Sequence, residues 1–309
     1  MNILIPGGTG LIGNAFIKAL LAAGDEVWVL SRNPEKARTL VGVKVFRWDG
    51  KTPQGWENLI EQADAIVNLS GENLVADPWT ADRKRLILTS RVDSGHAIVT
   101  AIKNNPHRLQ VLMQASAVGY YGPGDDRILD EASPAGSDYL AQICTEWEAS
   151  TQPVEVMGIR RVVIRTGLIE TTAGGMLPRL LLPFRLFVGG PLGNARQWWS
   201  WIHLLDEVDA MIFLLKNPSA QGAYNLTAPE PVRMSEFGRT LGKVLQKPYW
   251  FPVPAFGLKL LLGEMSKIVL EGQRAVPRRL QDLGYHFHFT QLKPALKDLL
   301  GKSVENSGG

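Results

Sequence analysis

The first half of the chain alternates between short apolar runs and longer segments whose apolar positions recur with helical spacing. The short runs predict strands at residues 3–5, 27–30, 43–46, 65–69, 110–115 and 159–165. The helical spacing predicts helices at residues 15–21, 34–40, 82–104 and 138–150. Apolar strands that alternate with helices are typical of a parallel sheet covered on both faces. The pattern therefore predicts an α/β fold, a doubly wound parallel sheet of the Rossmann type.

The pattern becomes less regular after residue 168. Residues 170–200 contain paired glycines and tryptophans and predict loops and short elements. Beyond them we expect helices at residues 206–215 and 235–245 and a strand at 223–226. We predict a Rossmann domain over residues 1–168 with a returning segment at about 204–230, a small substrate lobe and C-terminal region over 169–302, and a disordered tail over 303–309.

Composition narrows the class of protein. Lys and Arg total 33 against 30 for Asp and Glu, and a net charge of +3 argues against nucleic acid as a partner. The single cysteine excludes an internal disulfide, and no metal-ligand spacing is present. The sequence contains no run of 18 apolar residues, so we do not expect a membrane span. A strand is predicted directly after Met1, where a secretory signal would stand. We therefore expect a cytoplasmic protein without a membrane partner.

Glycine is the unusual feature, with 31 residues in a chain of 309, whereas about 7% is usual. Gly7, Gly10 and Gly13 have the spacing G-x-x-G-x-x-G between a predicted strand and a predicted helix. In a dinucleotide-binding turn the first glycine allows the tight turn, the second lets backbone approach a pyrophosphate, and the third allows close helix packing. The N–H groups at the helix start would then hold the phosphates.

The end of the second predicted strand indicates which dinucleotide binds. An NAD site usually has an acidic residue there, whereas an NADP site offers a cation to the 2′-phosphate. Here the strand ends in Ser31 and Arg32, and no acid occurs before Glu35. Arg32 can pair with a phosphate through its planar fork, and Ser31 can add a hydroxyl. The residues therefore favour NADP(H).

These motifs resemble the extended short-chain dehydrogenase/reductase superfamily, and more closely the atypical YfcH-type "epimerase family" proteins. Four segments carry the resemblance, residues 7–13, 67–73, 115–122, and 189–193 with 201–203. Residues 271–274 with Pro277 also fit the small C-terminal region of that family. The resemblance implies a Rossmann domain that binds NADP(H), a C-terminal substrate lobe and, from extended relatives, a homodimer. It implies much less about the substrate.

The resemblance also implies positions for the cofactor. The pyrophosphate turn corresponds to Thr9, Gly10, Leu11 and Ile12, and the 2′-phosphate pair to Ser31 and Arg32. The backbone that passes the adenosine and ribose corresponds to Leu69, Ser70 and Gly71. Arg91 matches a helix position that the family turns toward the cofactor, and Ile169 lies near the expected nicotinamide side.

The catalytic pattern of the wider superfamily is incomplete here. Its members use a Ser/Thr that donates to the substrate oxygen, and a Tyr-x-x-x-Lys pair in which the lysine lowers the pKa of the tyrosine. The candidates are Ser116 at the end of the fifth predicted strand and Tyr139 at the start of the next helix. The lysine position holds Ile143, so we expect the pKa of Tyr139 to stay near its ordinary value of about 10.

Other residues offer alternatives for proton transfer and substrate binding. The further proton-transfer candidates are Glu72, Tyr120, Tyr121, Glu131 and His203. Arginines 160, 161, 165, 179, 185 and 196 occur near Trp198, Trp199 and Trp201, where they could clamp a phosphorylated or nucleotide substrate. Two hypotheses follow. One is an NADP(H)-dependent oxidoreductase or epimerase that acts on a small carbonyl or nucleotide-sugar-like substrate. The other is a non-catalytic NADP(H)-binding sensor.

Overall fold

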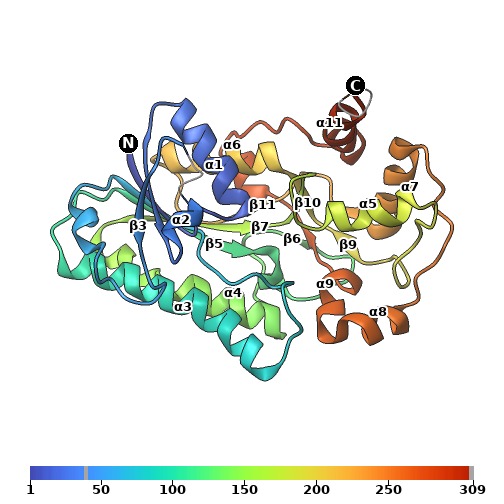
Figure 1. The fold of residues 1–309 in the computed structure, drawn as a ribbon, viewed down its shortest axis with the longest axis horizontal. Coiled ribbons are helices and arrows are strands. Elements are labelled where there is room, and N and C mark those ends of the chain that lie inside the picture. Colours follow the sequence, from blue (N-terminus) through green and yellow to red (C-terminus); the bar gives the residue numbers. More distant parts are fainter. Residues whose placement is uncertain (38–40, 306–309) are drawn as a thin grey trace.

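A seven-stranded parallel sheet forms the centre of the computed structural model, which describes residues 1–37 and 41–305 (Figure 1). Its strands are β1 (Asn2–Pro6), β2 (Glu26–Ser31), β3 (Lys44–Arg47), β4 (Ala65–Asn68), β5 (Val111–Ala117), β7 (Arg160–Thr166) and β11 (Gly222–Leu226). They lie in the order β11-β7-β5-β4-β1-β2-β3. The order reverses direction between β1 and β4, and the crevice at such a switch point is where doubly wound sheets bind ligands.

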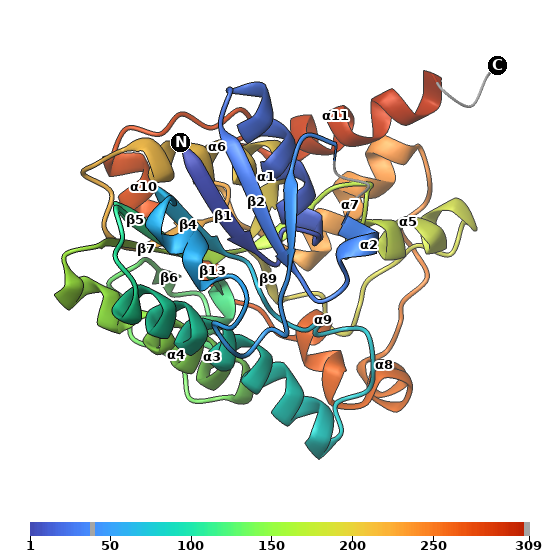
Figure 2. The same ribbon diagram turned by 60° about the vertical axis from the view of Figure 1, so that its left-hand side comes forward.

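Helices cover both faces of the sheet, as predicted (Figure 2). On one face α1 (Leu11–Ala22) packs beside α6 (Leu204–Lys216), and on the other α3 (Ala81–Asn104) packs beside α4 (Tyr139–Ser150). A short helix, α2 (Pro34–Ala37), follows β2. The helix predicted over residues 34–40 begins there, and residues 38–40 lie outside the described part of the chain. The predicted Rossmann-type architecture is confirmed.

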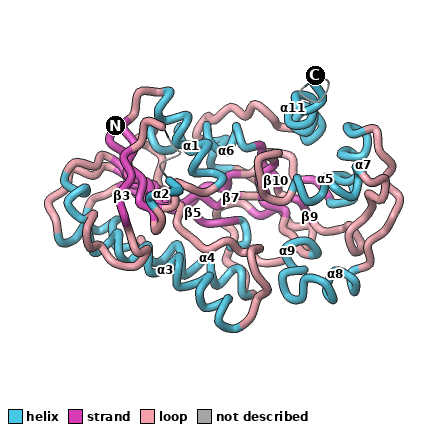
Figure 3. Tube along the Cα trace, in the orientation of Figure 1, coloured by secondary structure: helices cyan, strands magenta, loops and turns pink. Residues whose placement is uncertain are grey.

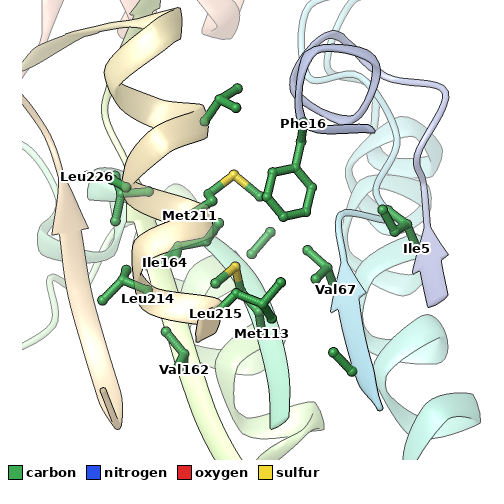
Figure 4. Close-up of a cluster of buried hydrophobic side chains, with 14 of the residues drawn as sticks. Ile5, Phe16, Val67, Met113, Val162, Ile164, Met211, Leu214, Leu215 and Leu226 are labelled. Carbon is green, nitrogen blue, oxygen red and sulfur yellow. The ribbon is translucent and has the colours of Figure 1, made fainter. Parts of the chain in front are cut away.

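Two apolar cores hold the helices to the sheet. On the α1 and α6 side, Phe16, Met211 and Leu214 are fully buried against the strands (Figure 4). On the α3 side, Ile98 and Trp28 belong to a second buried cluster. Burial of each such side chain contributes about 1.5–3 kcal/mol. These two layers fix the carboxyl ends of the strands, where the candidate site lies.

Much of the chain after β7 forms short helices and strands beside the sheet (Figure 3), and these contain a third apolar core. The elements that contribute to this core are β8 (Leu168–Glu170), α5 (Leu177–Arg185), β9 (Trp198–Trp199), β10 (Trp201–His203), β12 (Val232–Arg233), α7 (Met234–Leu245) and α11 (Leu292–Glu305). The same part of the chain also forms α8 (Ala255–Leu262), α9 (Lys267–Leu270), β13 (Arg274–Ala275) and α10 (Arg278–Asp282). A short strand from the first half, β6 (Ile128–Leu129), pairs with β13. Leu181, Trp199 and Phe237 lie at the centre of this third core.

The C-terminal end departs from the sequence expectation. We expected a disordered tail from residue 303, but α11 continues to Glu305. Residues 306–309 lie outside the described residues. Within the described part of the chain, no helix is both long and apolar enough to span a membrane.

Candidate functional site

The turn between β1 and α1 contains two glycines that the protein itself requires. Gly7 has φ +79°, and a Cβ there would stand 2.6 Å from the carbonyl oxygen of Leu69. A Cβ on Gly13 would stand 2.4 Å from the carbonyl oxygen of Gly8. Both distances are shorter than real contacts of Cβ atoms. Gly7 therefore allows β1 and β4 to end side by side, and Gly13 allows α1 to pack onto its own turn.

Gly10 differs, because the protein does not need a glycine there for packing. A Cβ at Gly10 would meet only the carbonyl oxygen of Gly7, at an ordinary 3.5 Å. Gly10 is exposed and is the N-cap residue of α1, where no side chain caps the first N–H groups. Those N–H groups have no partner within the helix and carry the positive end of its dipole. The open side of the turn is therefore suited to an anion such as a pyrophosphate.

The turn opens into a cavity of about 340 Å³, named here the β1–β2 cavity. It is lined by Gly7, Thr9, Gly10, Leu30, Ser31, Arg32, Asn33, Trp48, Asp49, Gly50, Lys51, Leu69, Ser70, Gly71, Glu72, Leu86, Thr89 and Ser90. The structure thus brings together Arg32, Ser31 and the backbone after β4. It adds the loop after β3, which our sequence analysis did not assign. The turn formed by Asp49 and Gly50 was the available signal, and Lys51, which follows it, lines the same cavity as Arg32.

Ser70 has an unused polar atom at the wall of the β1–β2 cavity. Its backbone N–H donates to Oδ1 of Asn68 at 3.2 Å. Its hydroxyl oxygen is buried and has no hydrogen-bond partner among the described residues. A buried hydroxyl without a partner is unfavourable by about 1–3 kcal/mol. A bound hydroxyl-bearing ligand, such as a ribose, would satisfy it.

Glu72 already occupies the charged end of the β1–β2 cavity. Its Oε1 lies 2.6 Å from Nη1 of Arg32, and its Oε2 lies 3.4 Å from Nη1 of Arg83. Partial burial opposes ionisation, but the two guanidiniums hold the pKa of Glu72 below its ordinary value. Glu72 is therefore ionised near neutral pH and poorly suited to donate a proton. It neutralises Arg32 in the absence of a phosphate.

Arg91 lies between this cavity and a second one. Its Nη1 donates to the carbonyl of Ile87 at 2.9 Å, and its Nη2 donates to the carbonyl of Glu72 at 3.1 Å. A Cβ on Gly71 would stand 2.9 Å from Cζ of Arg91, so the guanidinium lies directly against the backbone after β4. Its plane also lies over the ring of Trp147, with Cζ 4.9 Å from the ring centroid. Arg91 thus places a buried positive charge between the two cavities.

The second cavity, named here the β5–α4 cavity, has a volume of about 260 Å³. It is lined by Leu74, Arg91, Ala117, Val118, Gly119, Gly122, Pro123, Asp138, Leu140, Ile143, Cys144, Trp147, Thr166, Gly167, Leu168, Trp198, Ser200, Lys267, Ile268, Glu271, Gly272 and Gln273. Most of these side chains are apolar. The cavity lies where β5, β7 and α4 meet the C-terminal region.

Ser116 is absent from the walls of the β5–α4 cavity. Its hydroxyl donates to Oε1 of Glu148 at 2.7 Å. Glu148 also receives two bonds of 2.9 Å from the guanidinium of Arg165. Successive strand residues point to opposite faces, and it is the next residue, Ala117, that lines the cavity. The Ser116 hydroxyl is thus committed to a buried ion pair.

Tyr139 is also directed away from the β5–α4 cavity. Its hydroxyl donates to the backbone carbonyl of Lys84 at 3.0 Å, and its ring packs against Trp79 with centroids 5.3 Å apart. Burial, opposed by the charge of Arg91, raises the pKa of Tyr139 above the ordinary value that we expected. The residues of α4 that line the cavity are Leu140, Ile143, Cys144 and Trp147.

The remaining proton-transfer candidates serve structural contacts. Tyr121 donates to Oδ1 of Asn225 at 2.7 Å and accepts from Arg165 at 3.1 Å. The ring of Tyr120 lies under the same guanidinium, whose Cζ is 3.4 Å from the ring centroid. Glu131 accepts from the backbone N–H of Asn225 at 2.9 Å. None of these aromatic or acidic side chains lines the β5–α4 cavity.

His203 and Ile169 lie in the paired strands β10 and β8. The Nδ1 of His203 accepts from the backbone N–H of Leu205 at 3.0 Å, so the ring caps α6. Ile169 pairs with Ile202 and packs against the core beneath α1 and α6. Its neighbour Leu168 is the residue of β8 that lines the β5–α4 cavity. Leu11, in the first turn of α1, lies against Gly174 just beyond this strand, and Ile12 packs against the same core as Ile169.

The expected arginine clamp is dispersed. Arg160 donates to the carbonyls of Leu214 and Leu215 near the end of α6 and to that of Ala220 beyond it. None of arginines 160, 161, 165, 179, 185 and 196 lines the β5–α4 cavity. Of the three tryptophans, only Trp198 reaches its wall, whereas Trp199 and Trp201 are buried in the third core.

Comparison with known proteins identifies the family. Residues 3–227 match the model of the NAD dependent epimerase/dehydratase family, and residues 253–299 match a domain of unknown function, DUF1731. An SDR39U1 homologue of the epimerase family from Arabidopsis thaliana is 39% identical over 303 residues, which cover 97% of this chain and 87% of the relative. An epimerase family protein of Staphylococcus aureus is 36% identical over 301 residues, covering 97% and 99%.

Solved structures agree with this assignment. The human epimerase family protein SDR39U1, solved with NADPH, superposes with a TM-score of 0.87 at 32% identity, covering 97% of this chain and 99% of the other. A nucleoside-diphosphate sugar epimerase from Corynebacterium glutamicum gives a TM-score of 0.77 at 30% identity and covers 98% and 58%. The resemblance that the sequence motifs suggested is confirmed: this chain belongs to the NAD dependent epimerase/dehydratase family.

Proposed function

We propose that this protein binds NADP(H) and uses it as an oxidoreductase or epimerase on a small carbonyl substrate. The observation that carries the proposal is a pair of cavities at the carboxyl ends of the strands, because Arg91 lines one of them and contacts Gly71 and Glu72 in the wall of the other. A dinucleotide that binds with its adenosine end in the β1–β2 cavity would pass the glycine turn and bring its other end to the β5–α4 cavity. The human relative solved with NADPH supports this choice of cofactor.

The residues of the β1–β2 cavity fit the phosphorylated end of NADP(H). Arg32 and Lys51 supply two cations, and no acidic residue ends β2. The exposed N–H groups beside Gly10 suit the pyrophosphate. The unpartnered hydroxyl of Ser70 suits a ribose oxygen. The cavity therefore has a complementary group for each polar part of this half of the cofactor.

When bound, the nicotinamide supplies or accepts a hydride. The chain's own contribution is to position and shield it. Arg91 is held rigidly by two backbone carbonyls and by Trp147, so its charge remains fixed beside the cofactor path. Leu140, Leu168 and Ile268 line the adjoining cavity and keep water away from the reacting end.

A titration with NADPH and NADH tests the cofactor assignment. We expect Arg32→Ala to raise the Kd for NADPH at least tenfold and to leave the Kd for NADH unchanged, because only NADPH carries the 2′-phosphate. The matched control is Arg85→Ala, since Arg85 is an exposed arginine on α3 that pairs with Asp82. Equal affinity for both cofactors, unaffected by Arg32→Ala, would refute the assignment.

The alternative, a non-catalytic NADP(H)-binding sensor, is favoured by one observation. The hydroxyls of Ser116 and Tyr139 are both committed to bonds inside the protein, to Glu148 and to Lys84. Oxidation of NADPH with a panel of carbonyl compounds separates the two functions. Turnover that Ser116→Ala and Tyr139→Phe slow supports the enzyme with these catalytic residues. Tight NADPH binding without turnover on any compound supports the sensor.

A further inference from the structure

The β5–α4 cavity has apolar walls. Leu140 and Trp147 come from α4, Leu168 from β8, and Ile268 from α9. Trp198 closes another side. Its ring contacts the guanidiniums of two arginines outside the cavity, Arg233 and Arg274, whose Cζ atoms lie 4.1 and 4.5 Å from the ring centroid. The walls are thus rigid aromatic and aliphatic surfaces contributed by separate parts of the chain.

The uncharged polar side chains on these walls, Thr166, Ser200 and Gln273, already make hydrogen bonds within the protein. Thr166 donates to Oε1 of Glu207 at 2.7 Å. Ser200 donates to the carbonyl of Gln273 at 2.6 Å, and the side-chain amide of Gln273 donates to the carbonyl of Val118 at 2.7 Å. A polar ligand in this cavity would have to break such bonds or leave its own polar atoms unpaired.

The charges around the cavity are balanced. Arg91 and Lys267 line it together with Asp138 and Glu271. Asp138 accepts the backbone N–H of Ala141 as the N-cap of α4, and Arg91 is bonded to two backbone carbonyls. The cavity therefore offers no excess of positive charge. Burial of a diphosphate without paired donors is strongly unfavourable.

The volume of the cavity also limits the size of the ligand. An apolar cavity of about 150 Å³ holds one benzene molecule. The β5–α4 cavity, at about 260 Å³, is less than twice as large. Within its own walls it has room for a nicotinamide ring and one small molecule beside it. A nucleotide sugar would have to extend beyond these walls, past Lys267 and Glu271, which also line a neighbouring cavity of about 600 Å³.

We propose that the β5–α4 cavity binds a small, uncharged and mainly apolar molecule of about one ring, and that it rejects nucleotide sugars. The apolar surface removed from water would stabilise such a complex by about 25 cal/mol per Å². This inference rests on the proposed function, because the ligand would bind beside the cofactor. It narrows the substrate class from carbonyl or nucleotide-sugar-like compounds to apolar ones.

The test uses 4-fluoroacetophenone as the probe, observed by ¹⁹F NMR on the full chain with and without NADP⁺. We expect the probe to bind and UDP-glucose not to displace it. Leu140→Asp and Ile268→Asp should each weaken probe binding at least tenfold, since each places a charge on an apolar wall. The matched control is Val156→Asp, a substitution at a position that is 90% exposed and outside the cavity.

Three results would count against the inference. Displacement of the probe by UDP-glucose, absence of probe binding, or binding that neither wall variant changes would overturn the inference. Thermal melting of each variant shows whether it is folded, and the two wall positions provide independent tests. NADPH binding is measured by calorimetry on the same samples. Probe binding without NADPH binding would refute the proposed cofactor and leave the apolar site in place. NADPH binding without probe binding would refute the apolar site and leave the proposed cofactor in place.

Discussion

The carboxylate of Glu72 and a cofactor phosphate would compete for the same guanidinium. Glu72 holds Arg32 at 2.6 Å, although the Arg32 side chain is 66% exposed. Partly exposed ion pairs contribute about 0.2–1 kcal/mol. We therefore expect Glu72→Gln to lower the Kd for NADPH by about 2- to 5-fold, because the phosphate no longer displaces a carboxylate. Calorimetric titration measures this change.

The control for Glu72 is Glu264→Gln. Glu264 is an exposed carboxylate that pairs with Lys84 outside the β1–β2 cavity. Its substitution should leave the Kd for NADPH and for NADH unchanged. Weaker binding of NADPH to the Glu72→Gln variant would show that Glu72 itself supports the cofactor, and would contradict the competition.

Two glycines of the turn have different expected roles: Gly13 is needed for packing, and Gly10 for contact with the ligand. Gly13→Ala should lower the free energy of unfolding by about 2 kcal/mol or more, because its Cβ would stand 2.4 Å from the carbonyl oxygen of Gly8. Gly10→Ala should cost less, about 1 kcal/mol, since the added Cβ has an ordinary contact at 3.5 Å and only the N-cap preference for glycine over alanine is lost. It should nevertheless raise the Kd for NADPH at least tenfold. Denaturant unfolding and calorimetry measure the two effects, and a stability loss without an affinity loss in Gly10→Ala would contradict the ligand contact.

Sequence motifs predict the conformation of the backbone better than they predict the direction of a single side chain. The glycine spacing predicted the turn, and the structure shows why Gly7 and Gly13 are needed. The positions of Ser116 and Tyr139 along their elements were also correct. A shift of one residue turns a side chain to the opposite face of a strand, or about 100° around a helix. The sequence does not determine that shift, so it did not reveal that Ala117 and Leu140 face the cavity.

The first turn of α6 contains a buried carboxyl group whose ionisation makes the stability of the fold depend on pH. Glu207 is fully buried, and burial raises its pKa to about 8, despite the bond from Thr166. A folded pKa above the unfolded value of about 4.3 means that the folded state binds more protons between these values. The resulting stability is complete below about pH 4.3 and is lost as the pH rises toward about 8.

We therefore expect Glu207→Gln to unfold with a weaker dependence on pH. The amide keeps an oxygen for the Thr166 hydroxyl but does not ionise. Between pH 5.5 and 8 the wild-type free energy of unfolding should fall more steeply than that of the variant, by up to about 1.4 kcal/mol per pH unit. Denaturant titrations across this range measure it. The exposed Glu236, in the first turn of α7, is the control, and Glu236→Gln should follow the wild type. Parallel curves for Glu207→Gln and the wild type would contradict the buried ionisation.

Elements in the first half of the chain were predictable because they repeat one local pattern. Apolar strands and amphipathic helices alternate from β1 to β7, and each strand signal agrees with a strand of the sheet. The loop after β3 was not assigned to the site, because its contribution depends on a tertiary contact between Gly50 and Arg32, where a Cβ would stand 3.7 Å from Cδ of the arginine. Periodicity carries no information about such contacts.

Hydrogen bonds between residues far apart in the sequence connect the C-terminal region to the sheet. Glu131 accepts the backbone N–H groups of both Asn225 and Arg279. The side-chain amide of Asn225 donates to the carbonyl of Val276 at 2.9 Å. These contacts join residues more than fifty positions apart, so no local signal reveals them. They explain why the C-terminal region can supply one wall of a cavity whose other walls come from β5 and α4.

Asp206 is a principal anchor of this region. Its carboxylate accepts the backbone N–H groups of His288 at 2.7 Å and Phe289 at 3.0 Å. Asp206→Ala leaves these two donors without their partner, and each loss is unfavourable by about 1–3 kcal/mol. We expect a lower melting temperature and faster hydrogen exchange in the segment before α11. Asp209→Ala, which removes only a half-exposed contact with the His288 ring, should change the free energy of unfolding by less than about 1 kcal/mol. Equal exchange in the two variants would show that the region is held by its apolar core alone.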